Sequence, residues 1–448
     1  MALMPHWPLY TGTVKSISNS NVKKVLSLLD NPQLNLQNVI HVVGTNGKGS
    51  TTAYLKSILK EHGFSVNTYT SPHLVNCNER ININGSDISD EDLFYYTEKT
   101  KNICQDNNIE LTIFEATTIT AMLCFGDKKA DYNIIEAGMG GLHDATNIFN
   151  PSQVKCVIIT PVSLDHVKFL GNTKMDIIDH KIQVSQGKIP IVASSQDADV
   201  NNYIANYVNH YNLPLGRYGI NFEAIKIENE DGTIDKENFC LSVEGEEYIL
   251  PLPPLLGEHQ LVNLSTSVYT LIRFMDFELD YQKLINGIKN TKWRGRLEEI
   301  KYKKVLNHLP DDSKIYFDGA HNEGGAIALA NFIKDQKQNM PDYKIIVIIG
   351  RSKDADTTIF AKHLVNLLDG IIAIRSNCEA RPESEITIYH QILNANFTQS
   401  LAHKAKSLKQ ALGIVKEEFC NDKCLVFIAG SLYLAREIKL LANGQGTI

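Results

Sequence analysis

Short apolar runs alternate with longer amphipathic stretches in residues 39–195 of this 448-residue chain. Continuous runs rich in Val and Ile are typical of strands buried on both faces, whereas apolar positions at helical spacing indicate helices. The predicted strands are residues 39–43, 66–69, 132–136, 154–160 and 189–193. The predicted helices are residues 51–62, 90–105 and 116–125. This alternation predicts a parallel sheet that is covered by helices on both faces.

The pattern changes after residue 220. Residues 221–251 contain short alternating runs around a turn at Gly232, which predict a small antiparallel appendage. Two helices are then expected, at residues 260–275 and 281–289. A second α/β alternation predicts strands at 314–317, 344–349, 371–375 and 425–429, and helices at 326–337, 357–368, 408–418 and 434–441. We therefore expect a domain boundary near residue 296, with Trp293-Arg-Gly-Arg296 as the linker.

Composition excludes some classes of protein. The chain has 44 Lys and Arg against 51 Asp and Glu, a net charge of −7, and no dense basic run, so nucleic acid is not an expected partner. No apolar run approaches the roughly 20 residues of a membrane span. Residues 1–8 lack the charged and apolar regions of a signal peptide. The eight cysteines are scattered, and Cys420 and Cys424 lack a second pair, which predicts buried thiols and a reducing cytoplasm.

The segment from Gly44 to Thr51, Gly-Thr-Asn-Gly-Lys-Gly-Ser-Thr, carries the strongest chemical signal. A strand, a glycine-rich turn and a helix form a phosphate cradle, because backbone N–H groups and the positive end of the helix dipole face the anion. Lys48 adds a full charge, and a hydroxyl of Ser50 or Thr51 can reach a magnesium ion. The spacing differs from the standard G-x-x-x-x-G-K-[ST] loop, since Gly49 intervenes before Ser50. A glycine-serine turn without a ligand is the alternative.

Polar side chains follow several other predicted strands, at the edge where doubly wound sheets bind ligands. Ser71 follows strand 66–69, and Glu136 ends strand 132–136 before a glycine-rich turn, a combination that suits magnesium. Asp165 and His166 follow strand 154–160. Asp318, after strand 314–317, can accept a hydrogen bond from a ribose hydroxyl.

Each of these positions also has a purely structural interpretation. Ser71 can cap a helix or turn, and Asp144 and Asn147 can form an Asx-turn after strand 132–136. His166 can be an ordinary surface or core histidine. Asp318 can belong to a strand-end turn that holds no ligand.

Taken in order, the motifs resemble those of the Mur ligase superfamily, specifically its folylpolyglutamate synthase and dihydrofolate synthase branch. The markers are Gly-Thr-Asn-Gly-Lys-Gly-Ser at 44–50, Thr-Ser-Pro-His-Leu at 70–74, Gly-Met-Gly-Gly-x-x-Asp-Ala-Thr-Asn at 138–147, Leu-Asp-His-x-x-x-Leu-Gly-Asn-Thr at 164–173 and Asp-Gly-Ala-His-Asn at 318–322. The resemblance covers almost the whole chain and includes the shortened phosphate loop. It implies an α/β protein with a P-loop NTPase-like, parallel-sheet N-terminal domain and a smaller, Rossmann-like α/β C-terminal domain.

The resemblance also implies roles for single residues. The expected ATP-binding residues are Gly44, Thr45, Asn46, Gly47, Lys48, Gly49, Ser50, Thr51, Asn263 (at the adenine), Arg296, Asp318 and His321. The expected magnesium ligands are Ser71, Glu136 and His166. The residues expected against the pterin substrate are His143, Asp144, Ala145 and Val184. Lys48, His166 and Lys181 would be catalytic, and Lys181 matches a lysine that many members carry as a carbamate, able to bind a second magnesium ion.

Three positions depart from the family pattern. Lys181-Ile-Gln-Val184 replaces Lys-Ala-Gly-Ile, which leaves the modification of Lys181 open. Leu142 replaces an arginine beside the expected pterin contacts, and Glu323 replaces a proline after Asn322.

The implied activity is ATP-dependent addition of L-glutamate to dihydropteroate, to folates and folylpolyglutamates, or to both, through an acyl phosphate, with ADP and phosphate released. Residues 1–295 are expected to bind ATP and the pterin or folate, and residues 296–448 to bind glutamate and close on ATP. Arg381 and Lys353 are hypotheses for the glutamate pocket. We expect a cytoplasmic monomer of folate and one-carbon metabolism, with small-molecule substrates and no membrane partner. Two alternatives stay open: a Mur-type ligase of cell-wall precursors, and a binding protein that hydrolyses ATP only to change shape.

Overall fold

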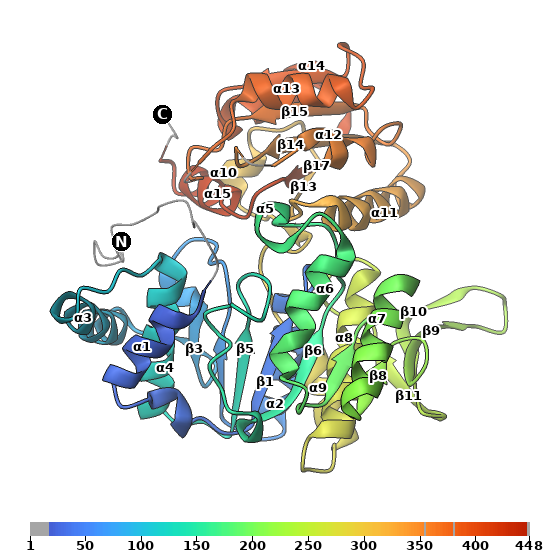
Figure 1. Ribbon diagram of the computed structural model, residues 1–448. Helices are drawn as coiled ribbons and strands as arrows, with labels where there is room; N and C mark the ends of the chain where they lie inside the picture. The colour runs from blue at the N-terminus through green and yellow to red at the C-terminus, as the bar shows by residue number, and fades with distance from the viewer. Residues whose placement is uncertain (1–17, 354, 380, 446–448) are drawn as a thin grey trace. The chain divides into compact units, whose positions relative to one another are not determined.

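A computed structural model describes residues 18–353, 355–379 and 381–445 of the chain (Figure 1). Residues 1–8, considered above for a signal peptide, lie outside the described residues. The chain divides into two compact units. Unit 1 contains the residues through Pro254 together with His259–Lys292, and unit 2 contains Leu255–Glu258 and the residues from Trp293 onward.

Among the described residues, unit 1 is built on an eight-stranded sheet of order β4-β3-β2-β5-β1-β6-β7-β8. The parallel strands are β1 (Val39–Val43), β2 (Val66–Tyr69), β5 (Tyr132–Glu136), β6 (Val154–Ile159), β7 (Ile191–Ala193) and β8 (Leu215–Arg217); β3 (Ile81–Ile83) and β4 (Ser86–Asp87) pair antiparallel. Every residue of β1 and β5 is buried, which confirms the strands that their continuous apolar runs predict. β7 begins only at Ile191, because Pro190 has no N–H to donate to a ladder.

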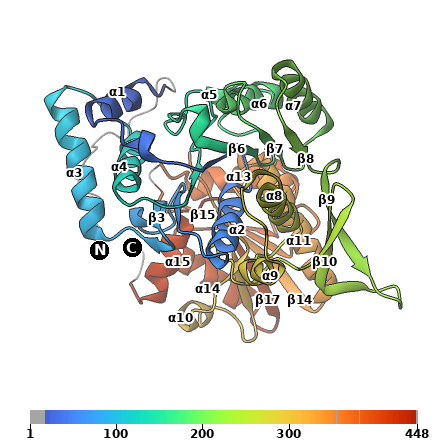
Figure 2. The same ribbon diagram turned by 90° about the horizontal axis from the view of Figure 1, so that it is seen from below.

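Helices cover both faces of this sheet (Figure 2). One face carries α2 (Lys48–Glu61), α8 (His259–Phe274) and α9 (Tyr281–Lys289), and the other carries α1 (Ser20–Leu28), α4 (Ile113–Asp127), α6 (Lys174–Ile182) and α7 (Ala198–Tyr211). α4 begins before the predicted residue 116, because Thr112 and Glu115 form a capping box. The other helical segments of unit 1 are η1 (Pro32–Asn35), η2 (Cys77–Arg80), α3 (Asp90–Asp106), η3 (Pro151–Gln153), α5 (Val167–Leu170) and η4 (Gln183–Ser185).

The predicted appendage is confirmed as an antiparallel sheet of order β11-β10-β9. Its described strands are β9 (Phe222–Glu228), β10 (Ile234–Val243) and β11 (Glu246–Pro251). Phe222 stacks on Tyr269 of α8 with ring centroids 4.3 Å apart, so the appendage is packed against the helix layer of unit 1.

The described part of unit 2 contains a second sheet, of order β12-β13-β17-β14-β15-β16. Its strands are β12 (Glu298–Glu299), β13 (Lys314–Phe317), β14 (Tyr343–Gly350), β15 (Gly370–Ile374), β16 (Ala402–Ala405) and β17 (Lys423–Ala429), and all except β12 are parallel. Its helices are α10 (Lys303–Leu306), α11 (Glu323–Asn339), α12 (Thr357–Lys362), α13 (Glu385–Asn394), α14 (Leu408–Glu418) and α15 (Leu434–Ala442). α12 ends before the predicted residue 368, and Asn366 has a φ of 65°, which a helix does not permit.

The cysteines test another sequence prediction. All eight are free thiols. Cys124, Cys156 and Cys424 are buried, as predicted, but Cys420 is exposed, because it lies in the turn between α14 and β17 and not within the strand. Among the described residues, no helix has the length and apolar character needed to cross a bilayer.

Candidate functional site

The glycine-rich turn between β1 and α2 depends on two glycines. Gly44 and Gly47 have φ angles of 140° and 88°, which residues with a side chain rarely adopt. A Cβ at Gly44 would collide with the hydroxyl of Thr160, which follows β6, and a Cβ at Gly47 would lie 2.5 Å from Oδ1 of Asn263 on α8. The turn is therefore packed on one side by the β6 end and on the other by α8.

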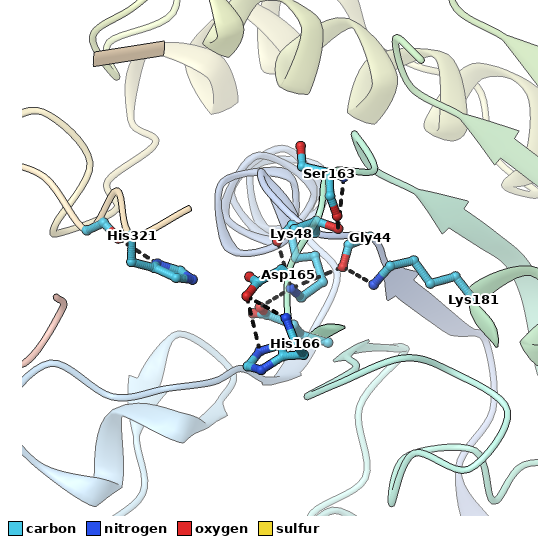
Figure 3. Close-up of polar contacts among 10 residues, drawn as sticks. Gly44, Lys48, Ser163, Asp165, His166, Lys181 and His321 are labelled. Atoms are coloured by element: carbon cyan, nitrogen blue, oxygen red, sulfur yellow. Dashed lines mark hydrogen bonds and ion pairs between the residues drawn. The ribbon is translucent and has the colours of Figure 1, made fainter. Parts of the chain in front are cut away.

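Hydrogen bonds tie the same turn to the loop after β6. The backbone N–H groups of Thr45 and Asn46 donate to the Pro161 carbonyl at 3.0 and 3.2 Å. The Thr45 hydroxyl donates to the Ser163 carbonyl and accepts from the Ser163 N–H, both at 3.1 Å. This second loop carries Asp165 and His166 (Figure 3). The phosphate-loop candidate and these two residues are thus held in one hydrogen-bonded framework.

The first turn of α2 contains polar groups that the protein leaves unsatisfied. The hydroxyls of Ser50, Thr51 and Thr52 are buried and have no hydrogen-bond partner among the described residues. A buried hydroxyl without a partner costs about 1–3 kcal/mol, so such a cluster is unfavourable unless something else binds it. The first N–H groups of a helix also lack intrahelical partners and carry the positive end of the dipole. Orphaned hydroxyls at this helix end fit a magnesium-bound phosphate.

Two lysines converge on the Gly44 carbonyl (Figure 3). Lys48 Nζ donates to the carbonyls of Thr45 (3.1 Å) and Gly44 (3.4 Å) and lies 4.0 Å from Oε1 of the buried Glu136. Lys181, from α6, is buried and donates to Gly44 O at 2.6 Å. Burial, together with the charge of Lys48, lowers the pKa of Lys181 to about 7. Lys181 is therefore partly a neutral amine near neutral pH.

The three expected magnesium ligands belong to one edge of the sheet. β2, β5, β1 and β6 are neighbouring parallel strands, and Ser71, Glu136 and His166 lie at or beyond the carboxyl ends of β2, β5 and β6. His166 has a φ of 50°, its side chain is half exposed, and its Nε2 lies 3.9 Å from Asp165 Oδ1. The described residues contain no group of three His, Cys, Asp or Glu side chains arranged to hold a metal. The set therefore stays a prediction.

The segment after β5 is a turn that satisfies its own polar groups. Asp144 is buried and accepts from Met139 N (2.7 Å), Thr146 N (2.9 Å) and Thr146 Oγ1 (2.6 Å). Burial raises the pKa of this carboxyl. His41 Nε2 lies 2.9 Å from Thr146 Oγ1, and burial lowers the pKa of His41 to about 3, so this ring is neutral. The geometry supports the Asx-turn alternative for Asp144.

The four residues expected against the pterin do not share one accessible surface. Asp144, Ala145 and Val184 are buried, and Val184 packs against Gly141. Only His143 is exposed. Their contact with a substrate remains a prediction.

The expected site residues of unit 2 gather around Asp318. Its Oδ1 accepts from Ala320 N at 2.7 Å and its Oδ2 accepts from Leu297 N at 2.8 Å. Arg296 Nη1 donates to Gly295 O at 2.8 Å and would lie 2.5 Å from a Cβ at Gly319. His321 Nδ1 is hydrogen-bonded to Gly319 O at 2.8 Å. The structure thus packs Arg296, from the segment before β12, against the turn after β13 that carries Asp318 and His321.

The remaining expected residues differ in their surroundings. Asn263 is buried, donates to Gln260 Oε1 at 3.0 Å and faces Gly47, so the structure places it at the phosphate loop. Lys353 and Arg381 lie on adjacent segments joined by a backbone hydrogen bond of 2.8 Å. Sequence reasoning missed the anchoring role of Thr160 and Ser163. The available signal was their position at the end of the predicted buried strand 154–160 (Thr160) and shortly after it (Ser163).

Comparisons with known proteins identify relatives over most of the chain. Residues 42–271 match the family model of the Mur ligase middle domain, and residues 299–442 match that of the dihydrofolate synthetase C-terminal domain. A relative from Bacillus subtilis, dihydrofolate synthase/folylpolyglutamate synthase, is 30% identical, and the alignment covers 93% of both chains. Dihydrofolate synthetase of Saccharomyces cerevisiae is 29% identical, over 95% of this chain and 98% of the relative.

Solved structures show the same fold. Folylpolyglutamate synthase of Mycobacterium tuberculosis, complexed with ADP and AMPPCP, superimposes with a TM-score of 0.81 at 22% identity and covers 95% of both chains. E. coli FolC in complex with DHPP and ADP has a TM-score of 0.81 at 23% identity and covers 98% of this chain and 96% of FolC. These likenesses confirm the predicted α/β fold of both units.

Proposed function

The chain belongs to the dihydrofolate synthase/folylpolyglutamate synthase family of Mur ligases, and from this premise we propose that it joins L-glutamate to a pteroate or folate carboxylate with ATP. The activity is that of an ATP-dependent acid–amino-acid ligase, with ATP and magnesium as cofactors. Relatives that cover nearly the whole chain carry these activities in their names.

One observation carries the proposal: the buried, unpartnered hydroxyls of Ser50 and Thr51 stand at the start of α2, in the described part of the chain, within a turn that Lys48 flanks. Buried polar groups without a partner are few in native proteins, and a bound ligand or ion is one arrangement that satisfies them. A triphosphate with magnesium supplies both the acceptor oxygens for the helix N–H groups and a cation for the hydroxyls.

Amide formation from a carboxylate requires ATP to activate it. A carboxylate does not react with an amine, because oxide is a poor leaving group. Transfer of the γ-phosphoryl group to the carboxylate breaks the phosphoanhydride bond and gives an acyl phosphate and ADP. The glutamate amine then attacks the acyl carbon, loses a proton and displaces phosphate, which leaves the amide. Phosphoryl transfer depends mainly on positioning and charge stabilisation, and Lys48 provides charge beside the transferred group.

The assigned roles extend the proposal to single residues. Ser71, Glu136 and His166 would hold magnesium, which neutralises charge on the phosphates when bound. Asn263 would contact the adenine, and Arg296, Asp318 and His321 would contact the nucleotide from unit 2. A neutral fraction of Lys181 is the form that reacts with carbon dioxide, which supports a carbamate at this position. Unit 1 would bind ATP and the pterin or folate, unit 2 would bind glutamate, and the enzyme would act as a monomer.

The test is an assay of the purified chain with ATP, magnesium and labelled glutamate. Dihydropteroate, a reduced folate monoglutamate and a muramyl precursor are supplied in turn, and the products are sized. The proposal predicts amide formation with a pteroate or folate acceptor, and phosphate release that requires acceptor and glutamate together. Turnover of ATP without a carboxylate would favour the shape-changing alternative, and ligation to the muramyl precursor would favour a cell-wall ligase.

A further inference from the structure

The connection between β2 and β3 is longer than a hairpin needs. The two strands pair antiparallel with Tyr69 opposite Ile81, so residues 70–80 form the hairpin loop. Most hairpin loops have roughly 2–5 residues. The ends of this loop meet, because Thr70 N donates to Arg80 O at 2.9 Å. A compact surface loop whose ends meet is an Ω-loop, a class that frequently carries function.

One carboxylate organises the second half of this loop. Glu79, in η2, accepts hydrogen bonds from three successive backbone N–H groups, those of Leu74 (2.7 Å), Val75 (3.1 Å) and Asn76 (2.8 Å). The Asn76 side chain in turn accepts from the Glu79 N–H, which completes a capping box. Successive N–H groups that converge form an anion-binding nest, and hydrogen bonds to a charged acceptor are the strong ones. The shape of residues 74–76 therefore depends on Glu79.

The first half of the loop is held at both of its ends. Ser71 lies between β2 on one side and Leu74, which Glu79 binds, on the other. Between them, Nδ1 of His73 accepts from Nε of the buried Arg80 at 2.9 Å. Ser71 therefore has little conformational freedom while these anchors are in place.

The register of the sheet places Ser71 beside a second proposed magnesium ligand. β2 and β5 are parallel neighbours with Tyr69 opposite Ile135, and Glu136 is the next residue of β5. Ser71, two residues beyond Tyr69, therefore leaves the sheet beside the end of β5 that carries Glu136. A ligand on a loop binds a metal well only if neighbouring groups hold it in place, because ordering a mobile segment costs conformational entropy.

We propose that Glu79 is a positioning residue for divalent-metal binding: its carboxylate fixes the β2–β3 loop and thereby holds the Ser71 hydroxyl at the magnesium site. Both carboxylate oxygens of Glu79 are engaged by N–H groups of the loop, so it acts through Ser71 and is not itself a ligand. The inference rests on the proposed function, in which Ser71 binds magnesium.

The test measures binding of Mn²⁺, a cation that takes the same oxygen ligands as Mg²⁺, to the full-length protein. Electron paramagnetic resonance reports free Mn²⁺, and the protein is kept in excess over ADP so that the nucleotide is bound. The proteins are the wild type, Ser71→Ala, Glu79→Ala and the double variant. We expect each single change to weaken Mn²⁺ binding about tenfold, and the double variant to bind no more than about twofold more weakly than Ser71→Ala.

Gln153→Ala is the matched control. Gln153 also anchors a segment through its side chain: Oε1 accepts from Asn150 N (3.0 Å), and Nε2 donates to Gln33 O (2.9 Å) and Leu36 O (2.7 Å). It lies before β6, at the opposite edge of the sheet from Ser71. Its loss should destabilise the protein, as the loss of Glu79 should, but change Mn²⁺ affinity less than about twofold.

The pattern of affinities decides the proposal. A loss in Glu79→Ala that disappears in the Ser71→Ala background supports it. Independent losses, about a hundredfold in the double variant, would overturn it, and so would wild-type affinity in either single variant or an equal loss in Gln153→Ala. If Glu79→Ala fails to fold, Glu79→Gln, which keeps one of the two acceptor oxygens, replaces it in the same cycle with an expected loss of about threefold.

Amide formation by the wild-type protein separates this proposal from the proposed function. An active wild type whose Mn²⁺ affinity is unchanged in Glu79→Ala would overturn the role of Glu79 alone. A wild type that shows the expected Mn²⁺ pattern but forms no amide would support the role of Glu79 and overturn the ligase function.

Discussion

Two glycine-rich turns follow neighbouring strands of the unit 1 sheet, yet they treat their polar groups in opposite ways. The turn after β1 leads into α2 with the Ser50 and Thr51 hydroxyls buried and, within the described residues, unpartnered. The turn after β5 gives Asp144 three hydrogen-bond donors from its own segment. The first turn leaves hydroxyls for the ligand that we propose, whereas the second turn uses its own donors to satisfy a buried carboxylate. Both turns are rich in glycine, so their composition does not separate them. They differ in whether their buried polar groups have hydrogen-bond partners within the described protein.

The largest expected effect tests the ligand side of this comparison. Lys48→Ala should reduce amide formation by about a thousandfold or more, because the phosphoryl group loses its charge partner in the phosphate loop. The measurement is glutamate-dependent phosphate release with a pteroate acceptor. Lys60→Ala, on the exposed side of α2, should retain activity. Near-normal turnover of Lys48→Ala would contradict the phosphate assignment.

The second prediction tests the structural side. Asp144→Asn should lower the free energy of unfolding by about 2–3 kcal/mol, because an amide nitrogen replaces one of the two carboxylate oxygens that accept backbone and hydroxyl donors. Urea denaturation measures the change. Asp231→Asn is a matched control: Asp231 accepts from Thr233 N (2.9 Å) and Oγ1 (2.6 Å) in an exposed turn, and the change there should cost less than about 0.5 kcal/mol. An equal loss of unfolding free energy in Asp144→Asn and Asp231→Asn would argue against a stabilising role of Asp144 in the turn after β5.

A third substitution separates ligand binding from stability. Thr51→Val removes a buried hydroxyl that has no partner in the described protein, so folding should be unaffected or slightly more favourable, whereas the affinity for ADP and magnesium should fall about tenfold. Nucleotide titration and thermal unfolding of the same sample provide both values. Thr270→Val removes a hydroxyl that donates to Thr266 O at 2.7 Å and should leave nucleotide affinity unchanged. A stability loss in Thr51→Val without an affinity loss would reverse the interpretation.

The last prediction concerns a gradual effect, the change of stability with each pH unit. The pKa of Lys181 is lowered from 10.5 to about 7, so between pH 7 and 10 the unfolded chain binds a proton that the folded chain does not. Stability linked to this residue therefore rises with pH across that window, by at most about 1.4 kcal/mol per pH unit. Urea denaturation over this range should give a steeper rise for the wild type than for Lys181→Met. Identical slopes would show that the amine is not buried as described, or that it is already modified.

Much of the fold follows from the sequence because both sheets bury continuous apolar strands. Residues 39–43, 66–69, 132–136 and 314–317 coincide with observed strands. The edge strands β4 and β12, two residues each, are too short to form a pattern, and β16 contains His403 and Lys404. Such strands are defined by their neighbours and not by their own composition.

The sequence predicts those parts of the candidate site that lie within one short segment. The positive-φ glycines and Lys48 are local, and the phosphate loop follows from them. The packing of Asn263 against Gly47 joins residues more than two hundred positions apart, so no local pattern indicates it. The family resemblance implied only a contact between Asn263 and the adenine. Whether Asp144 binds a ligand or forms a turn depended on three donors whose positions the sequence alone does not give.

The central claim is that magnesium and a triphosphate complete the unsatisfied start of α2. A crystal structure of the protein with magnesium and a non-hydrolysable ATP analogue tests it most directly. The account predicts the β and γ phosphates against the N–H groups that open α2, with Lys48 Nζ and a hydroxyl of Ser50 or Thr51 contacting the phosphates or their magnesium ion. Phosphates bound at another site, with those hydroxyls still unpartnered, would contradict it.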